Sequence, residues 1–311
     1  MEIFTQTKVD FMRSWKGAVA LSLVLIVVAL GSLLVRGLNF GIDFTGGTLL
    51  EVSYEQPAEL SSIRSTLVEA GYEGAVVQHV GTSRDVLIRL APREGVSTAQ
   101  LSERVMAALR ASDDQLQMRR QEFVGPQVGD ELVERGGLAL LYALLGILVY
   151  VALRFEKRFA VGSVAALVHD VILTLGFFSL LQLEFDLTIM AAILAVIGYS
   201  LNDTIVVFDR IRENFRKMRK GSSADVVNAS LNQTLSRTVL TSGTTALVLL
   251  ALFFLGGELI HGFATALLVG VLVGTYSSIY IASPVLLALG VSREDLLPVE
   301  KEGAEQEEPL P

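Results

Sequence analysis

The chain has 311 residues, of which 51% are hydrophobic and only 19% are charged, and its mean hydropathy is +0.53. Soluble domains carry about 25% charged residues, so this composition excludes a single soluble globule. The formal net charge of -8 argues against a nucleic-acid-binding protein, and the absence of cysteine excludes disulfides, thiolate metal ligands and a cysteine nucleophile.

Six apolar stretches are long enough to form helices across a hydrocarbon core about 30 Å thick. They cover residues 17–35, 137–153, 159–183, 187–208, 238–256 and 262–289. We interpret the first stretch as an uncleaved anchor rather than a secretory signal peptide, because its 19 residues exceed the usual apolar region and no A-x-A-like site ends it. The chain therefore divides into five parts: residues 1–16, a first helix over 17–35, an outer domain over 36–136, five helices within 137–290, and an acidic tail over 291–311 that we expect to be disordered.

The distribution of Lys and Arg predicts the orientation, because basic residues in short loops stay on the cytoplasmic side. The N-terminal segment carries three of them, the turn at 154–158 carries three, and the stretch 209–237 carries seven. The two short loops on the opposite side, 184–186 and 257–261, carry none. Both termini are therefore expected in the cytoplasm, with residues 36–136 on the outer side.

Inside the outer domain, apolar residues alternate or recur at helical spacing in a fixed order. Two glycines, Gly46 and Gly47, predict an outer-surface turn that includes Asp43 and leads into the first strand. A simple tight turn is the alternative to a functional role, and a phosphate cradle is rejected because a strand follows instead of a helix. The elements after this turn are a strand at 48–54, a helix from 57 to 70, strands at 75–80 and 84–90, a helix at 97–109 and a strand at 117–124. This β-α-β-β-α-β order predicts a ferredoxin-like α+β domain inserted between the first two membrane helices.

Ionisable side chains within the apolar stretches are the strongest functional signal, since each costs about 2.5 to 3.5 kcal/mol on insertion scales. His169 and Asp170 lie in the third stretch, Asp203 lies beside Asn202 in the fourth, and Arg237 directly precedes the fifth at its cytoplasmic end. At a rise of about 1.5 Å per residue, Asp203 and Arg237 reach a similar depth and could form a pair. The alternative is that these residues only hold helices together, through contacts worth about 1 kcal/mol each. His169 fits a hydrogen-bonded core histidine as well as a proton relay. We find no spacing typical of a metal site, a hydrolase or a nucleotide-binding loop.

Small residues recur every four positions in the last apolar stretch, which lets another helix approach closely. They are Gly262, Ala266, Gly270 and Gly274, followed by Ser278. The pattern predicts a helix-packing interface within the chain or with a partner.

Five segments in order resemble the SecD/SecF family of bacterial protein-export membrane proteins, within the resistance-nodulation-division superfamily. They are residues 41–48 (GIDFTGGT), 122–129 (EFVGPQVG), 166–176 (ALVHDVILTLG), 197–214 (IGYSLNDTIVVFDRIREN) and 233–245 (QTLSRTVLTSGTT). The resemblance implies a multi-pass protein of the inner membrane that forms half of a pseudo-symmetric unit with SecD. It further implies that the pair uses the proton gradient, with no bound cofactor, to assist late translocation of preproteins through the SecYEG channel, with YajC as a further partner.

The resemblance also implies residue roles. Asp203 matches the proton-pathway carboxylate of the family, with Asn202 beside it, and Arg237 matches its arginine; His169 and Asp170 match the HD pair of the third helix. Such a protein is an accessory subunit and not an enzyme. Two alternatives remain open at this point: half of a proton-coupled exporter of small molecules, or a structural scaffold.

Overall fold

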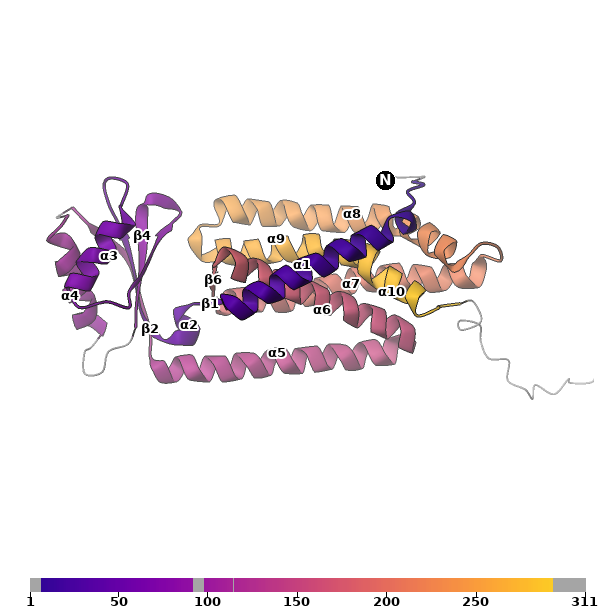
Figure 1. The fold of residues 1–311 in the computed structure, drawn as a ribbon, viewed down its shortest axis with the longest axis horizontal. Coiled ribbons are helices and arrows are strands. Elements are labelled where there is room, and N and C mark those ends of the chain that lie inside the picture. The colour runs from indigo at the N-terminus through magenta and orange to yellow at the C-terminus, as the bar shows by residue number, and fades with distance from the viewer. Residues whose placement is uncertain (1–6, 92–97, 114, 293–311) are drawn as a thin grey trace, which may run out of the picture.

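The computed structural model describes residues 7–91, 98–113 and 115–292, and it consists of a small sheet domain beside an elongated helical bundle (Figure 1). The predicted acidic tail lies outside the described residues from position 293 onward. The sheet domain contains β2 (Gly47–Ser53), α3 (Leu60–Glu69), β3 (Val76–Val80), β4 (Thr82–Leu90), α4 (Thr98–Arg110) and β5 (Gln117–Val124).

The four strands lie in the order β3-β4-β2-β5, and each neighbouring pair is antiparallel. Leu50 and Val52 of the central strand pack with Ile63 and Leu67 of α3 and with Val105 of α4, so both helices share one core with one face of the sheet. Alternation along β2 therefore buries one face of the strand against the helices, as its sequence indicates. This arrangement confirms the predicted ferredoxin-like domain.

The first helix of this domain starts at Leu60, three residues later than predicted. The backbone N–H groups of Tyr54 and Ala58 donate to the carbonyls of Arg84 and Ser83 at 2.9 and 2.8 Å. These bonds hold residues 54–58 beside β4, which delays the helix.

The bundle consists of long helices whose apolar windows match the predicted stretches. It contains α1 (Trp15–Val35), α5 (Pro126–Arg154), α6 (Lys157–Leu181), α7 (Leu187–Lys217), α8 (Ser223–Leu255) and α9 (Glu258–Ser277), which continues through a π-helical turn, η2 (Ser278–Ala282), into α10 (Ser283–Ala288). Within the described part of the chain, six spans are long and apolar enough to cross a membrane. This number confirms the six-helix prediction.

Three boundaries differ from the sequence-based expectation, because helices continue past the apolar residues. Helix α5 begins at Pro126, so residues 126–136, assigned above to the outer domain, belong to the second membrane helix. Proline suits the first turn of a helix, because the backbone N–H that it lacks would form no hydrogen bond within the helix at that position. The polar stretch 209–237 is also mostly helical, since α7 ends at Lys217 and α8 begins at Ser223. Ser222 caps α8 together with Asp225 in a capping box.

Helices α6, α7 and α9 form the interior of the bundle, whereas α1, α5 and α8 expose most of their apolar side chains (Figure 1). Helix α9 approaches α7 closely, and a Cβ atom added at Gly270 would lie 2.1 Å from a methyl carbon of Val196. Helices α1 and α6 cross as closely at Gly176, where an added Cβ would lie 2.2 Å from Cβ of Ala29. These glycines set the distances between the helices around the polar residues described next.

Candidate functional site

Asp203 lies on α7 in the interior of the bundle and is 6% exposed. Its Oδ1 accepts a hydrogen bond from the Thr238 hydroxyl of α8 at 2.7 Å, and its Oδ2 accepts one from the Ser278 hydroxyl of η2 at 2.5 Å. Each carboxylate oxygen therefore has one neutral donor from a different helix. Hydroxyl donors can stabilise either protonation state of a carboxyl group, because a hydroxyl both donates and accepts.

Asp170 lies on α6 and is completely buried. Its Oδ2 accepts hydrogen bonds from the Ser277 hydroxyl of α9 at 2.8 Å and from the Ser200 hydroxyl of α7. Its Oδ1 lies 2.8 Å from Nδ1 of the neighbouring His169. Three helices thus meet at this carboxylate.

The imidazole of His169 extends this network to α1. Nε2 lies 3.2 Å from the Ser22 hydroxyl, which donates to the Tyr276 hydroxyl at 3.2 Å, and Tyr276 donates in turn to the carbonyl of Ala18 at 2.7 Å. Because the single hydrogen of Ser22 is then used, its oxygen is free to accept a hydrogen bond from Nε2. The two ring nitrogens of His169 thus face the Asp170 carboxylate and the Ser22 hydroxyl, so the ring connects the carboxylate to α1.

The structure does not bring Asn202 and Arg237 into this buried network. Both residues are exposed in this chain. Among the described residues Arg237 has no ion pair; instead, the next residue, Thr238, binds Asp203 through its hydroxyl. Among the described residues Asp203 and Arg237 thus form no direct ion pair, although the guanidinium is near enough to act electrostatically on the carboxyl group.

Sequence reasoning missed the hydroxyl donors. Ser200, Ser277 and Ser278 are fully buried, and Ser22 is 1% exposed. Ser278 appeared only as a member of the small-residue stripe, in which Gly270 and Gly274 pack against Val196 and Ser200 of α7. The sequence feature that could have identified them is the pair of adjacent serines, Ser277 and Ser278, at the point where the small-residue stripe reaches the same depth in the membrane as the carboxylates. Among the described residues, no group of three or more His, Asp or Glu side chains could hold a metal ion.

A second polar cluster joins the sheet domain to the bundle at the outer turn. Asp43 lies in the short helix α2 (Ile42–Thr45), and its carboxylate accepts a hydrogen bond from the backbone N–H of Leu187, the first residue of α7, at 3.0 Å. Gly46 and Gly47 follow with φ angles of 65° and 124°, which favour glycine. The turn also packs against α5, because a Cβ at Gly129 would lie 3.1 Å from the Gly46 nitrogen.

Arg89 of β4 completes this junction. Its guanidinium pairs with Glu184 at 2.9 Å and donates to the carbonyl of Phe40 at 2.6 Å. Glu184 belongs to β6 (Glu184–Phe185), which pairs in parallel with β1 (Asn39–Phe40). Burial raises the pKa of Glu184, and the nearby Arg89 guanidinium opposes that rise. The junction therefore ties the outer domain to the hairpin between α6 and α7.

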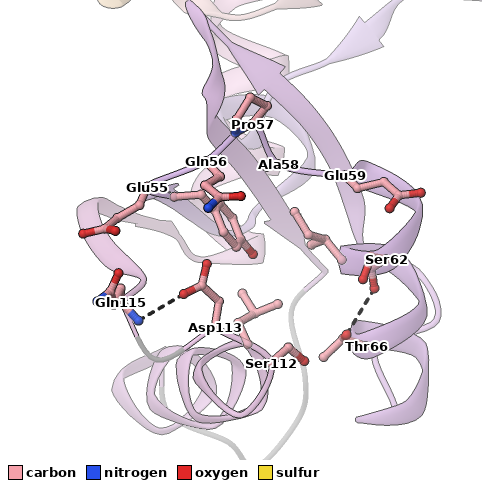
Figure 2. A pocket seen from close by; sticks show the side chains of 13 residues that line it. Glu55, Gln56, Pro57, Ala58, Glu59, Ser62, Thr66, Ser112, Asp113 and Gln115 are labelled. Carbon is pink, nitrogen blue, oxygen red and sulfur yellow. Dashed lines mark hydrogen bonds between the residues drawn. The ribbon is translucent and has the colours of Figure 1, made fainter.

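The described residues also form a polar cavity of about 430 Å³ in the outer domain (Figure 2). Tyr54, Glu55, Glu59 and Asp113 contribute to its lining. Burial and the Asp113 carboxylate raise the pKa of Tyr54 to about 12.

The family description "Protein export membrane protein SecD/SecF, C-terminal" matches residues 104–292, and "SecD/SecF GG Motif" matches residues 31–58. The chain is 57% identical to the protein translocase subunit SecF of Vibrio alginolyticus, with 96% of each chain covered. It is 53% identical to the subunit of the same name from Pseudomonas aeruginosa, with 93% of this chain and 94% of that one covered.

Solved structures give the same relationship for the fold. The crystal structure of SecDF, a translocon-associated membrane protein from Thermus thermophilus, superposes with a TM-score of 0.84 at 43% identity, covering 93% of this chain and 39% of that one. A SecDF structure in the super-membrane-facing form gives a TM-score of 0.69 at 42% identity, covering 92% of this chain and 39% of that one. The chain therefore spans about two fifths of the length of these SecDF chains.

Proposed function

Because the chain belongs to the SecD/SecF family of protein-export membrane proteins, we propose that it carries protons inward through Asp203 and the His169–Asp170 pair to drive a late step of export. It is a multi-pass protein of the bacterial inner membrane and an accessory subunit of Sec export. In this proposal, SecD is its immediate partner and the SecYEG channel supplies the emerging preprotein, with YajC as a further partner. Protons are the coupling ion, no cofactor takes part, and the subunit breaks no covalent bond. Both termini lie in the cytoplasm.

One observation carries the proposal: two carboxylates are buried in the membrane bundle, and neutral hydroxyls from several helices surround them. A charge at the centre of a membrane helix costs about 2.5 to 3.5 kcal/mol on insertion scales, so a packing role alone could be served by uncharged residues. A carboxyl group held by hydroxyls can exist in both protonation states without leaving a donor or acceptor unpaired. Asp203 and Asp170 therefore meet the requirement for reversible proton carriers.

The outer junction supports a link from proton binding to movement. Protonation of Asp203 weakens the charge-assisted hydrogen bonds from Thr238 and Ser278, since bonds to an ionised acceptor are about twice as strong as neutral ones. The contacts of α7 with α8 and α9 then change. Because α7 begins at the junction with Asp43 and Arg89, a shift of α7 reaches the outer domain on the side where the preprotein emerges.

Gradient-dependent export tests the proposal. Inverted inner-membrane vesicles containing Asp203→Asn as the only copy of this subunit should complete late translocation no faster with a proton gradient than without one. The substitution keeps size and polarity but cannot exchange a proton. Asp209→Asn is the matched control, since Asp209 lies on the same helix but is 44% exposed and pairs with Arg154 at its cytoplasmic side. A full gradient response of Asp203→Asn would show that Asp203 is only a packing residue.

A further inference from the structure

Two successive serines connect the two buried carboxylates. Ser277 is the last residue of α9 and Ser278 is the first of η2. The side chains of adjacent helical residues point about 100° apart, so side chains from one turn can contact two neighbouring helices. Ser277 donates to Asp170 of α6 at 2.8 Å, and Ser278 donates to Asp203 of α7 at 2.5 Å. A single turn of backbone therefore carries one donor for each carboxylate.

Each of these hydroxyls has a second acceptor within reach. The Ser277 hydroxyl lies 3.1 Å from the carbonyl of Gly274, and the Ser278 hydroxyl lies 3.0 Å from the carbonyl of Thr275. A serine has one hydrogen to donate, so it can serve only one acceptor fully. An ionised carboxylate attracts that hydrogen. A protonated carboxyl group donates its own hydrogen to the serine oxygen, and the serine hydrogen then turns to the backbone carbonyl.

The backbone at this turn is irregular, which separates it from the rest of α9. The turn Ser278–Ala282 is π-helical, and the Ser283 hydroxyl donates to the carbonyl of Ser278 at 3.0 Å. Pro284 follows and has no N–H to continue a regular ladder. Turns of this kind are often found at functional sites, where they allow local adjustment of a helix.

We propose that Ser277 and Ser278 are positioning residues that couple the protonation of Asp203 to that of Asp170. This inference rests on the proposed proton-carrying function. The serines keep their own hydrogens throughout, and the transferred proton moves between water and the carboxyl oxygens. Because both serines belong to one turn of backbone, a movement of that turn on protonation of one carboxyl group changes the distance between the other serine hydroxyl and its carboxylate. The two sites then take up protons in a linked way.

Infrared spectroscopy of the purified protein tests this inference directly, because protonated carboxyl groups have a distinct C=O band that Asp203→Asn identifies. Loss of the Ser278 hydroxyl removes a donor to the ionised carboxylate, so the Asp203 band in Ser278→Ala should appear at a pH about one unit higher than in wild type. The band should also shift in frequency, since the protonated carboxyl group loses the serine oxygen that accepts its hydrogen. Ser278→Thr, which retains a hydroxyl, should restore the wild-type titration.

The matched control is Ser163→Ala on α6, since Ser163 is fully buried and its hydroxyl has no partner among the described residues. It should leave the Asp203 titration unchanged. Coupling is tested by Ser277→Ala, which removes a donor from Asp170 only and should still shift the Asp203 titration. The remaining titratable or charged groups around the two carboxylates are His169 on α6, Tyr199 on α7, Arg237 on α8 and Tyr276 on α9.

The outcomes separate this inference from the proposed function. If Ser278→Ala titrates like wild type, the positioning role of Ser278 is wrong. If Ser277→Ala leaves the Asp203 band unmoved, the coupling is wrong. A wild-type Asp203 that shows no protonation over the accessible pH range overturns the proposed function and this inference with it. Melting temperatures of the variants identify any that fail to fold: if Ser278→Ala is one, Ser277→Ala still tests the coupling, and if Ser277→Ala is one, Ser278→Ala still tests the positioning role.

Discussion

Replacing Gly176 by alanine should separate α1 from α6. An added Cβ would lie 2.2 Å from Cβ and 2.8 Å from Cα of Ala29, so the obstacle is backbone and not a flexible side chain. Carbon atoms pack at about 3.5 Å or more, so the helices must move apart by about 1.3 Å at this point. Overpacking of this kind costs about 1 to 3 kcal/mol, and we expect the upper half of that range because no rotamer change relieves it.

The movement also affects the buried network. Ser32 of α1 lies 2.8 Å from Ser179 of α6, and Ser22 lies 3.2 Å from His169, so both hydrogen bonds lengthen when the helices separate. Hydrogen bonds within membranes contribute about 0.6 kcal/mol on average, which adds little to the cost but changes the surroundings of His169. We therefore expect Gly176→Ala to lose stability and to weaken gradient-driven export together.

Thermal unfolding of the purified protein in detergent measures the loss of stability, with Gly146→Ala of α5 as the control. Gly146 has no atom within 4 Å of an added Cβ, so its substitution should be neutral or slightly stabilising. A cysteine pair, Ser32→Cys with Ser179→Cys, reports the separation in this cysteine-free chain: it should form a disulfide in the wild-type background and form it poorly with Gly176→Ala. If Gly176→Ala melts with the control and cross-links normally, the close crossing of α1 and α6 is refuted.

Three further predictions concern groups outside the membrane-spanning helices. Because the pKa of Glu184 is raised, the folded protein binds more protons than the unfolded chain, so the free energy of unfolding should rise as pH falls through that pKa and be lower above it. Glu184→Gln should reduce the dependence of the melting temperature on pH in this range. An unchanged dependence would show that another group causes it. Because the pKa of Tyr54 is about 12, tyrosinate absorbance at about pH 11 should be the same in wild type and Tyr54→Phe. A lower absorbance in Tyr54→Phe would show that Tyr54 has the pKa of an ordinary tyrosine. Single-cysteine labelling should modify Asp113→Cys from the outer side and Lys220→Cys only from the cytoplasm, and the reverse pattern would overturn the predicted orientation.

The sequence predicted the architecture because hydropathy and alternation are local signals. The strand 117–124 coincides with β5, and all six spans were visible as apolar stretches. The start of α5 at Pro126 was not visible, because the first residues of this helix are polar and an apolar window cannot detect a helix that continues into water. Local patterns therefore predicted which elements form, while their ends depend on surroundings that the pattern does not contain.

The candidate site was predictable only for its charged members. Asp203 and Asp170 stand out because a carboxylate in an apolar stretch is costly. Ser277 and Ser278 do not stand out, since serine is common in membrane helices and its role depends on which helices pack together. Arg89 appeared only as one residue of an alternating strand, because its partner Glu184 lies in a distant hairpin of the bundle. Contacts between segments far apart in the chain leave no local pattern.

Helix α7 connects Asp203 in the bundle to the junction, where its first residue, Leu187, is hydrogen-bonded to Asp43. Asp203 lies 16 residues from Leu187, which corresponds to about 24 Å along the helix axis. A tilt of about 5° pivoting at Asp203 would displace Leu187 by about 2 Å, enough to break its 3.0 Å hydrogen bond to Asp43 unless the outer domain follows. A rearrangement of hydroxyl groups smaller than the length of one bond would in this way be amplified into a movement that a polypeptide outside the membrane can detect. The distance between Asp203 and the junction thus determines how far the outer end of α7 moves for a given tilt of the helix.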